Sequence, residues 1–315
     1  MKHVFIINPT AGKKDCTARI MAAAKDLAAR HGLDLECILT KSAGHAMETA
    51  RTLAQSGQEV RVYACGGDGT VNEVANGVAG YDNAAMTCIP VGTGNDFLKN
   101  FGDAAPRFAD PENLWDGPQL ALDAIDCSGR LALTVACSGF DAQVADDVHK
   151  YGDLPLLGGQ GSYILSLGVN FLLRSLGHDW TITLDGEAMP GEYALAAVCN
   201  GRYYGGGFMP VAEARMNDGV LNTLVVRKVS RVQFLRFVGP YSKGLYYTLP
   251  QVARCYTAKE ITIESQGGDI VTCLDGEITR NRAVTLRLSE KKVNFFGPAG
   301  CDPNATAVPL PETDA

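Results

Sequence analysis

The sequence predicts two domains of different class, an α/β domain followed by an antiparallel β-sandwich. Residues 1–125 alternate short apolar runs with helical patterns, which is typical of a parallel, doubly wound sheet. Beyond that point, short β-branched runs follow one another with Gly, Asn and Asp turns between them, which is typical of a sandwich. The length of 315 residues is enough for two domains that each bury a core.

The prediction of the first domain rests on strands and helices that alternate along the chain. Its expected strands cover residues 4–7, 35–39, 60–64 and 86–90, and its expected helices cover 17–30, 45–55 and 71–78. Gly32 and Gly57 are the stop signals of the first two helices. A polar loop follows each strand, and ligands of such sheets bind at the carboxyl ends of the strands. We therefore expect the binding site at these loops.

The second domain is expected to span residues 126–300. Its expected strands cover 131–136, 180–184, 193–199, 221–226, 261–263, 270–274 and 284–288, and two expected helices cover 163–176 and 232–238. Residues 301–315 are polar and contain proline, so we expect a mobile tail there.

Composition and charge narrow the class of protein. With 46% hydrophobic and 20% charged residues the chain is an ordinary globular protein, and its net charge of −7 argues against nucleic-acid binding. The apolar run at 4–7 is too short for a signal peptide, and no run approaches the ~18 residues of a membrane span. The ten cysteines form no C-x-x-C pair, and the five histidines show no ligand spacing. We expect a cytoplasmic protein without a zinc site.

A glycine-rich loop after the third strand is the first sign of chemistry. Gly66, Gly67 and Gly69 end a strand and open a helix, so backbone N–H groups and the helix dipole can hold a phosphate. Asp68 would repel that phosphate unless a divalent cation lay between them. The loop therefore favours a metal–nucleotide site, although it matches neither the P-loop nor the dinucleotide motif. The alternative is a turn that only lets strand and helix pack.

Seven segments in order resemble the diacylglycerol kinase catalytic-domain family, and in particular the soluble bacterial lipid kinases related to diacylglycerol and sphingosine kinases. They are residues 8–12, 66–73, 90–97, 138–142, 200–207, 217–221 and 274–277. The resemblance implies a Rossmann-like nucleotide domain, as in NAD kinase and diacylglycerol kinase, followed by a β-sandwich lipid domain. It also implies ATP-dependent, Mg²⁺-requiring phosphorylation of a lipid hydroxyl in a cleft between them.

The resemblance assigns roles to individual residues. Asp275 matches the proton acceptor, and Glu277 is the second catalytic residue of the same turn. Asp218, through its carboxylate, and Arg215 and Val220, through their carbonyls, look like a cation site of the second domain. The residues expected to hold ATP are Asn8, Pro9, Thr10, Ala11, Gly12, Thr40, Gly66, Gly67, Asp68, Gly69, Thr70, Val71, Asn72, Thr93 and Asn95.

Several of these residues have a plainer interpretation. An isolated Asp-Gly is most often a hairpin turn, and we interpret the second copy, Asp185-Gly186, as one, so that only the order of the family's segments selects Asp275. Asp68 and Asp96 are candidates for holding Mg²⁺, because this ion uses few carboxylates. Asp126 is a third candidate or only a turn residue. Lys13 and Lys14 either approach the phosphates or form a solvated pair.

Membrane contact is suggested by residues 227–243, which carry five basic and no acidic side chains among apolar ones. Such a stretch can lie on anionic lipid at the inner membrane face, although a helix packed on the sandwich is the favoured interpretation. Residues 156–161 match no family pattern and are the candidate region for lipid selection.

Two other functions are left open, an NAD kinase-like enzyme and a catalytically silent lipid or nucleotide sensor. The loop at 92–96 and the turn at 274–277 favour the lipid branch. The acceptor, whether diacylglycerol, phosphatidylglycerol, a long-chain base or another lipid alcohol, and a homodimer are also left open.

Overall fold

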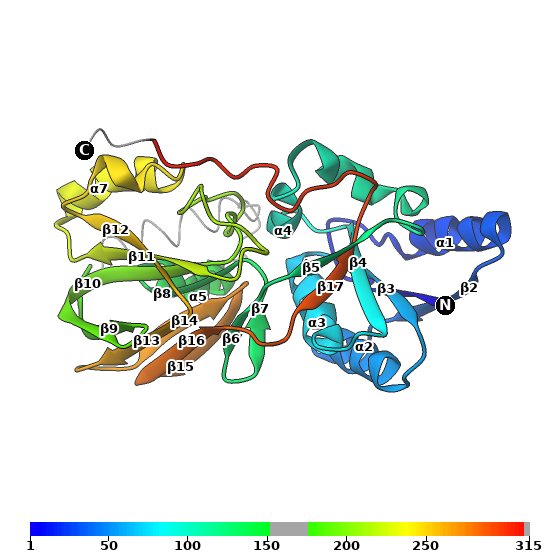
Figure 1. Cartoon of the computed structure of the whole chain (residues 1–315), viewed down its shortest axis with the longest axis horizontal. Coiled ribbons are helices and arrows are strands. Elements are labelled where there is room, and N and C mark those ends of the chain that lie inside the picture. The colour runs from blue at the N-terminus through cyan, green and yellow to red at the C-terminus, as the bar shows by residue number, and fades with distance from the viewer. Residues whose placement is uncertain (152–175, 312–315) are drawn as a thin grey trace. The chain divides into compact units, whose positions relative to one another are not determined.

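The computed structural model describes residues 1–151 and 176–311 and divides into two compact units (Figure 1). The first unit comprises Met1–Ala124 and Ser289–Thr306, and the second comprises Ile125–Leu288 and Ala307–Ala315. The segment 156–161 and the body of the helix expected over 163–176 lie outside the described residues.

A six-stranded sheet forms the centre of the first unit. Its strands are β1 (Lys2–Ile7), β2 (Asp34–Leu39), β3 (Val60–Gly66), β4 (Ala84–Pro90), β5 (Gln119–Leu122) and β17 (Val293–Phe296). They lie in the order β2-β1-β3-β4-β17-β5, and every neighbouring pair is parallel except β17 with β5. The apolar runs of β1, β3 and β4 are buried almost throughout, as expected for strands covered on both faces.

Helices cover both faces of this sheet. They are α1 (Thr17–His31), α2 (His45–Gln55), α3 (Asp68–Val78) and α4 (Asp96–Lys99), with 3₁₀ turns η1 (Gly102–Ala109) and η2 (Pro111–Asn113). Figure 1 shows α1 on one side and α2 with α3 on the other. This arrangement confirms the predicted doubly wound domain. The start of α3 needs a correction from residue 71 to Asp68, because Gly67 already takes the extended conformation of a residue preceding a helix.

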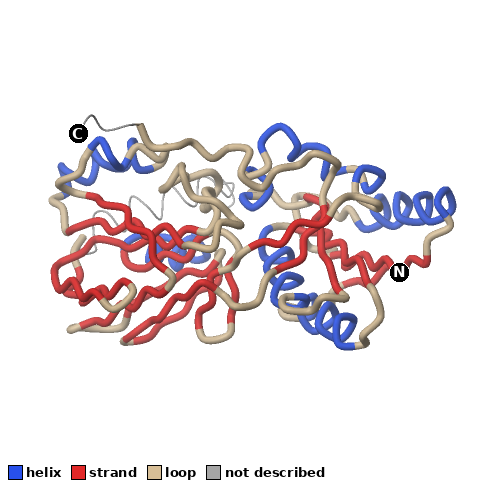
Figure 2. Tube along the Cα trace, viewed as in Figure 1, coloured by secondary structure: helices blue, strands red, loops and turns tan. Residues whose placement is uncertain are grey.

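The second unit is built from antiparallel strands, which dominate its part of the chain in Figure 2. The strands are β6 (Ile125–Cys127), β7 (Arg130–Ala132), β8 (Val135–Gly139), β9 (His178–Leu184), β10 (Glu187–Cys199), β11 (Leu221–Arg227), β12 (Ala253–Ala258), β13 (Glu260–Ser265), β14 (Ile270–Leu274), β15 (Glu277–Asn281) and β16 (Ala283–Leu288). Alternate residues of β10 pack into two different apolar clusters. Ala197 and Cys199 belong to one cluster, and Ala196 and Val198 belong to the other. Two cores separated by a sheet confirm the predicted sandwich-like class.

Three short helical elements lie in the described part of the second unit: α5 (Phe140–Tyr151), α7 (Arg231–Tyr241) and η3 (Tyr246–Thr248). Of these, α7 confirms the helix expected at 232–238. Ser230 and Gln233 form a capping box at its start, in which each side chain accepts the backbone N–H of the other residue.

The predicted boundary after residue 300 is wrong, because the chain returns to the first unit at Ser289. There β17 inserts between β4 and β5, and Phe295 and Phe296 are fully buried. The expected mobile tail is likewise wrong for residues 301–306, which belong to the first unit and bury Cys301 and Pro303. A four-residue strand that pairs with partners about 200 residues earlier leaves no local signal in the sequence.

Candidate active site

Three loops of the first unit meet at the carboxyl ends of β1, β3 and β4. The backbone N–H of Asn8 donates to the Cys65 carbonyl at 2.9 Å, and the Asn8 side chain donates to the Thr70 hydroxyl at 3.2 Å. The N–H of Val91 donates to the Gly66 carbonyl at 3.0 Å. The structure therefore brings together the three nucleotide-binding segments that the sequence predicts.

Glycines allow these loops to approach one another. A Cβ on Gly92 would lie 2.7 Å from the Cα of Gly67, and one on Gly12 would lie 2.4 Å from the Val91 carbonyl oxygen. By contrast, a Cβ on Gly69 would meet no atom within 4 Å, so the start of α3 is open at that point. A crowded backbone around an open helix start fits a phosphate group.

Two of the predicted metal ligands flank this loop. A Cβ placed on Gly94 would be 2.9 Å from an Asp68 carboxylate oxygen and 4.0 Å from one of Asp96, so both side chains face the same glycine. Asp68 also accepts the Phe97 N–H at 3.2 Å, and Asp96 accepts a hydrogen bond from Lys99 at 2.5 Å. Two carboxylates fit Mg²⁺, which uses few protein ligands and keeps several of its waters.

The other nucleotide residues fall into exposed and buried sets. Thr93 is exposed, and Thr10 donates through its N–H and hydroxyl to the Asn8 side chain. Thr40 follows β2 and donates its N–H to Ile7. Val71 and Asn72, however, are only 6% and 2% exposed, which indicates packing of α3. Pro9 and Ala11 are half-buried, whereas Gly12, Lys13 and Lys14 are exposed.

Asp275 lies at a two-residue hairpin between β14 and β15, with a positive φ of 46°. Its carboxylate accepts hydrogen bonds from the backbone N–H groups of Leu133 at 2.5 Å, Thr134 at 3.1 Å and Val135 at 3.1 Å. The Thr134 hydroxyl donates to it as well, at 2.5 Å. These four bonds fix the carboxylate in one orientation. Glu277, across the hairpin from Leu274, is exposed.

The second Asp-Gly copy has nearly the same geometry. Asp185 connects β9 to β10 with φ of 44°, which confirms the predicted hairpin. Its carboxylate accepts the N–H groups of Lys259 at 3.0 Å and Glu260 at 2.8 Å. Both aspartates therefore anchor a hairpin to a neighbouring loop. They differ in exposure, because Asp275 is half-buried and Asp185 is exposed.

Two further predicted metal residues lie in turns of the second unit. Asp126 accepts the N–H of Gly129 at 2.7 Å, as its interpretation as a turn residue requires. Asp218 accepts the N–H of Val220 at 3.3 Å in a turn where Gly219 has a φ of 78°, and Arg215 is exposed nearby in sequence. One carboxylate with turn carbonyls fits a hard cation that also keeps waters. Within the described ranges, no three His, Cys, Asp or Glu side chains gather as a metal site.

Sequence reasoning assigned no role to several buried carboxylates, among them Asp123 and Asp141. Asp123 is fully buried at the end of β5 and pairs with Lys292, and its position inside the apolar run 120–125 was the available signal. Burial raises the pKa of Asp141, while hydrogen bonds from the hydroxyls of Tyr204 and Tyr241 oppose that shift. Asp141 lies in the family-like segment 138–142, but its two tyrosine partners lie 63 and 100 residues away, so no local pattern predicts this cluster.

Comparisons with known proteins identify the family. Residues 2–125 match the family described as diacylglycerol kinase catalytic domain, and residues 134–297 match the YegS C-terminal NAD kinase beta sandwich-like domain. A Bacillus subtilis protein named diacylglycerol kinase is 29% identical over 75% of this chain and 77% of its own. A Staphylococcus epidermidis protein named "Putative lipid kinase" is 30% identical over 93% of this chain and 95% of its own.

A solved structure supports the fold. The crystal structure of a diacylglycerol kinase from Bacillus anthracis superposes with a TM-score of 0.69 at 22% identity, covering 98% of each chain. The two matched domains, in this order, and relatives that align over most of their length show that this chain belongs to the family of diacylglycerol kinase-like lipid kinases.

Proposed function

We propose that this protein transfers the γ-phosphate of Mg-ATP to a hydroxyl group of a membrane lipid such as diacylglycerol. The observation that carries the proposal is the contact of three strand-end loops through Gly12, Gly67 and Gly92, which leaves the start of α3 open. A cradle of this kind suits the polyphosphate of a nucleotide. The family supplies the reaction class, because phosphoryl transfer needs chiefly positioning and charge neutralisation.

In this proposal the first unit holds ATP and the second supplies the base. The N–H groups at the start of α3 hold the phosphates, and Asn8 keeps the neighbouring loop in place through Thr70. Asp68 and Asp96 would hold Mg²⁺, which neutralises the phosphate charge when bound. Asp275 accepts the proton of the lipid hydroxyl, since its hydrogen bonds to residues 133–135 keep the carboxylate in a fixed direction.

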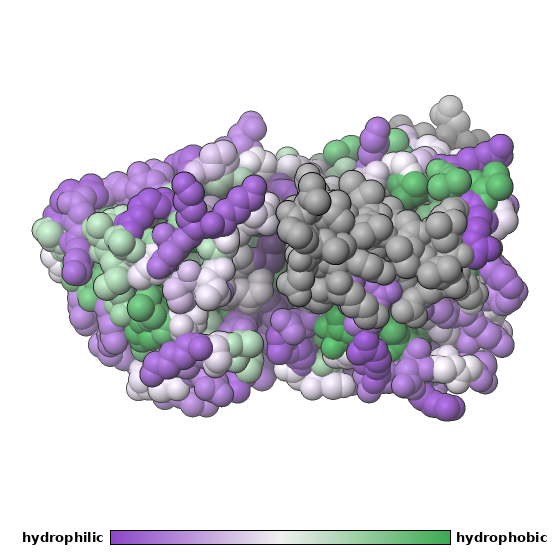
Figure 3. All heavy atoms as spheres, turned by 180° about the vertical axis from the view of Figure 1, so that it is seen from behind, coloured by the Kyte–Doolittle hydropathy of each residue, from purple (hydrophilic) through white to green (hydrophobic). Residues whose placement is uncertain are grey.

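We further propose that the surface of α7 contacts the membrane. This helix packs Phe234, Phe237 and Tyr241 into the unit, as expected for a helix on a sandwich. It also leaves Val232 and Leu235 62% and 61% exposed, and the space-filling view shows apolar side chains over this helix (Figure 3). Exposed apolar side chains among basic ones favour peripheral contact with anionic lipid. None of the helices in the described ranges has both the length and the apolar character to cross a bilayer.

The direct test is transfer of labelled phosphate from Mg-ATP to a panel of lipids in mixed micelles, with NAD as an additional acceptor. We expect a lipid alcohol to be labelled and NAD to remain unlabelled, and we expect chelation of Mg²⁺ to stop the transfer. Labelling of NAD would contradict the lipid assignment. ATP binding without labelling of any lipid would favour the silent sensor.

A further inference from the structure

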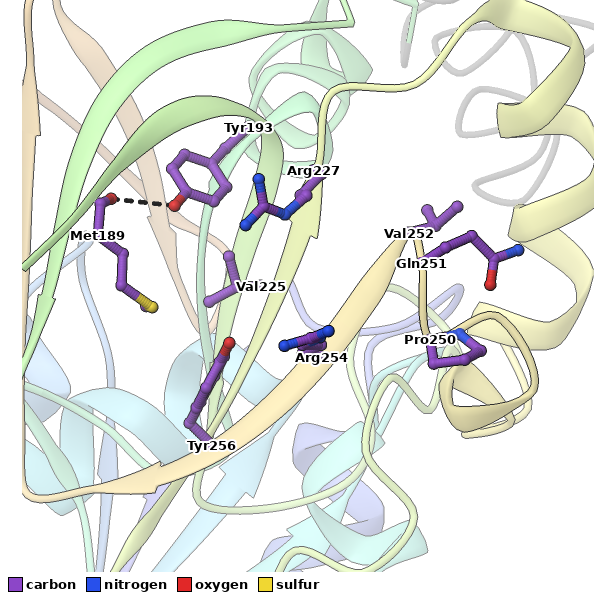
Figure 4. Close-up of a pocket in the computed structure, with 9 residues that line it drawn as sticks. All are labelled: Met189, Tyr193, Val225, Arg227, Pro250, Gln251, Val252, Arg254 and Tyr256. Atoms are coloured by element: carbon purple, nitrogen blue, oxygen red, sulfur yellow. Dashed lines mark hydrogen bonds between the residues drawn. The ribbon is translucent and has the colours of Figure 1, made fainter.

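A pocket opens on the sheet of the second unit where β10, β11 and β12 are neighbours. Val225 of β11 is paired with Arg254 of β12, and Arg227 and Tyr256 each lie two residues further along their own strand. Because side chains alternate along a strand, these four residues share one face. Figure 4 shows both guanidinium groups and the Tyr256 ring directed toward the space in front of Val225.

The two arginines give this pocket a positive charge. Both are exposed, and within the described residues no carboxylate lies within 4.0 Å of either guanidinium group. Other basic side chains of this unit do have such partners, for example Lys228 with Glu192 at 2.6 Å. Like charges on neighbouring strand positions repel each other, so an anion bound between them would relieve the repulsion.

The pocket walls suit a phosphate group attached to an apolar body. A guanidinium group can give a phosphate two parallel hydrogen bonds, and the Tyr256 hydroxyl is a further donor. Val225 and the Tyr193 ring provide apolar surface, and the Tyr193 hydroxyl donates to the Met189 carbonyl at 2.9 Å. A tyrosine is uncharged at neutral pH, and burial raises the pKa of Tyr193 further.

The surroundings indicate a membrane as the source of this anion. Pro250 and Gln251, on the pocket rim, lie in the loop that leads from η3 to β12. Four of the large exposed apolar side chains lie just before that loop, in α7 and around η3: Val232, Leu235, Leu245 and Tyr247. Arg227 is separated from the start of α7 by only three residues. The pocket is thus close in sequence to the surface proposed to contact lipid, and Val252 on its rim belongs to the same apolar cluster as Phe234 and Phe237 of α7.

We propose that Arg227 and Arg254 bind the headgroup phosphate of an anionic membrane lipid at a site separate from the kinase reaction. The lipid held here is a docking lipid and is not the acceptor of the transferred phosphate. The inference rests on the membrane contact proposed above and is independent of the transfer reaction, so it is tested without ATP.

The test is sedimentation of the full chain with phosphatidylcholine vesicles, with and without phosphatidylglycerol. The combined change of Arg227→Gln and Arg254→Gln should weaken binding to phosphatidylglycerol vesicles by roughly tenfold or more, since each basic residue at a membrane surface contributes appreciably. The matched control changes Arg51→Gln and Arg282→Gln, two exposed arginines outside the pocket, and should alter binding by less than about threefold. Circular dichroism checks that both variants are folded.

Three results would overturn the pocket assignment. The first is unchanged binding of the Arg227→Gln and Arg254→Gln variant, and the second is an equal loss in the control variant, which would indicate unspecific surface charge. The third is calorimetric binding of inorganic phosphate to the native chain as tight as its binding to phosphatidylglycerol vesicles. Val232→Ser with Leu235→Ser should weaken binding to both vesicle types. If this variant binds both vesicle types like the native chain, the proposed α7 surface is contradicted. The pocket assignment is then still tested by the arginine variants.

Discussion

Gly92 and Gly67 touch at the point where two strand-end loops cross, and this contact determines the form of the proposed nucleotide site. The sequence predicts the glycine-rich loop, because three glycines within four residues at a strand end are visible locally. It does not predict which glycine is indispensable. That depends on what a Cβ would meet, and Gly69 has open space where Gly92 has a backbone neighbour.

Gly92→Ala should therefore displace the Gly67 loop. A Cβ at 2.7 Å from a Cα forces the backbone apart, and overpacking of this kind costs about 1–3 kcal/mol of folding free energy. ATP affinity, measured by titration calorimetry, should fall together with stability, measured by urea unfolding. Gly69→Ala is the matched control and should leave stability within about 1 kcal/mol, since alanine is the better helix former. Equal losses of stability in the two variants would contradict the role of the loop crossing.

His3 should make the first unit sensitive to acid. This side chain is buried beside the Tyr63 hydroxyl, at 2.9 Å, and burial lowers its pKa from 6.5 to about 4. A histidine with a lowered folded-state pKa contributes full stability above pH 6.5 and loses it as the pH falls from 6.5 toward 4. Between pH 7 and pH 5 the native chain should lose about 2 kcal/mol from this residue.

The check on His3 is urea unfolding at both pH values, compared with His3→Asn. The asparagine retains an acceptor for the Tyr63 hydroxyl and does not titrate. The variant should therefore not lose the part of the folding stability that His3 accounts for between pH 7 and pH 5. If the variant loses as much folding stability at pH 5 as the native chain does, another group is responsible.

At the scale of elements, the ends of α1 and α2 are the most predictable helix features, whereas α3 begins three residues earlier than expected and α5 was not expected. The sequence places the end of α1 correctly because Gly32 takes the left-handed conformation, and it places α2 correctly because Gly57 follows it. The two Asp-Gly hairpins are predicted as well, since a two-residue turn with positive φ favours this dipeptide. Their anchors at residues 133–135 and 259–260 are tertiary contacts, which no local pattern predicts.

At the scale of the whole molecule, the connection between the units was predicted only in part. Near residue 125 the sequence changes from alternating strands and helices to successive short strands, and this change coincides with the start of the second unit. No sequence signal marks the return of the chain to the first unit at Ser289. This returning segment belongs to the first unit because β17 pairs with β4 and β5, which lie far from it in sequence.

Truncation distinguishes the two parts of the carboxyl terminus. A chain that ends at Thr306 loses only residues of the second unit, such as Val308, whose N–H donates to Ala212, so it should stay folded. A chain that ends at Leu288 loses β17 with Phe295 and Phe296, and burial of a phenylalanine contributes about 3–5 kcal/mol. Its first unit should not fold, as measured by circular dichroism and ATP binding. A folded, ATP-binding chain without β17 would contradict the six-stranded sheet as the stable unit.

The central claim is that Asp275 does more than anchor a hairpin, and the chain contains its own control for this question. Asp275→Asn and Asp185→Asn each remove the charge from a carboxylate that accepts backbone N–H groups at an Asp-Gly turn. The most direct measurement is kcat for phosphate transfer from Mg-ATP to lipid, with urea unfolding of the same three proteins. If Asp275 is the base, its change lowers kcat by about 10²–10⁴-fold, while Asp185→Asn keeps nearly full activity at a similar loss of stability. An Asp275→Asn variant that retains kcat within about tenfold of the native value would contradict the account.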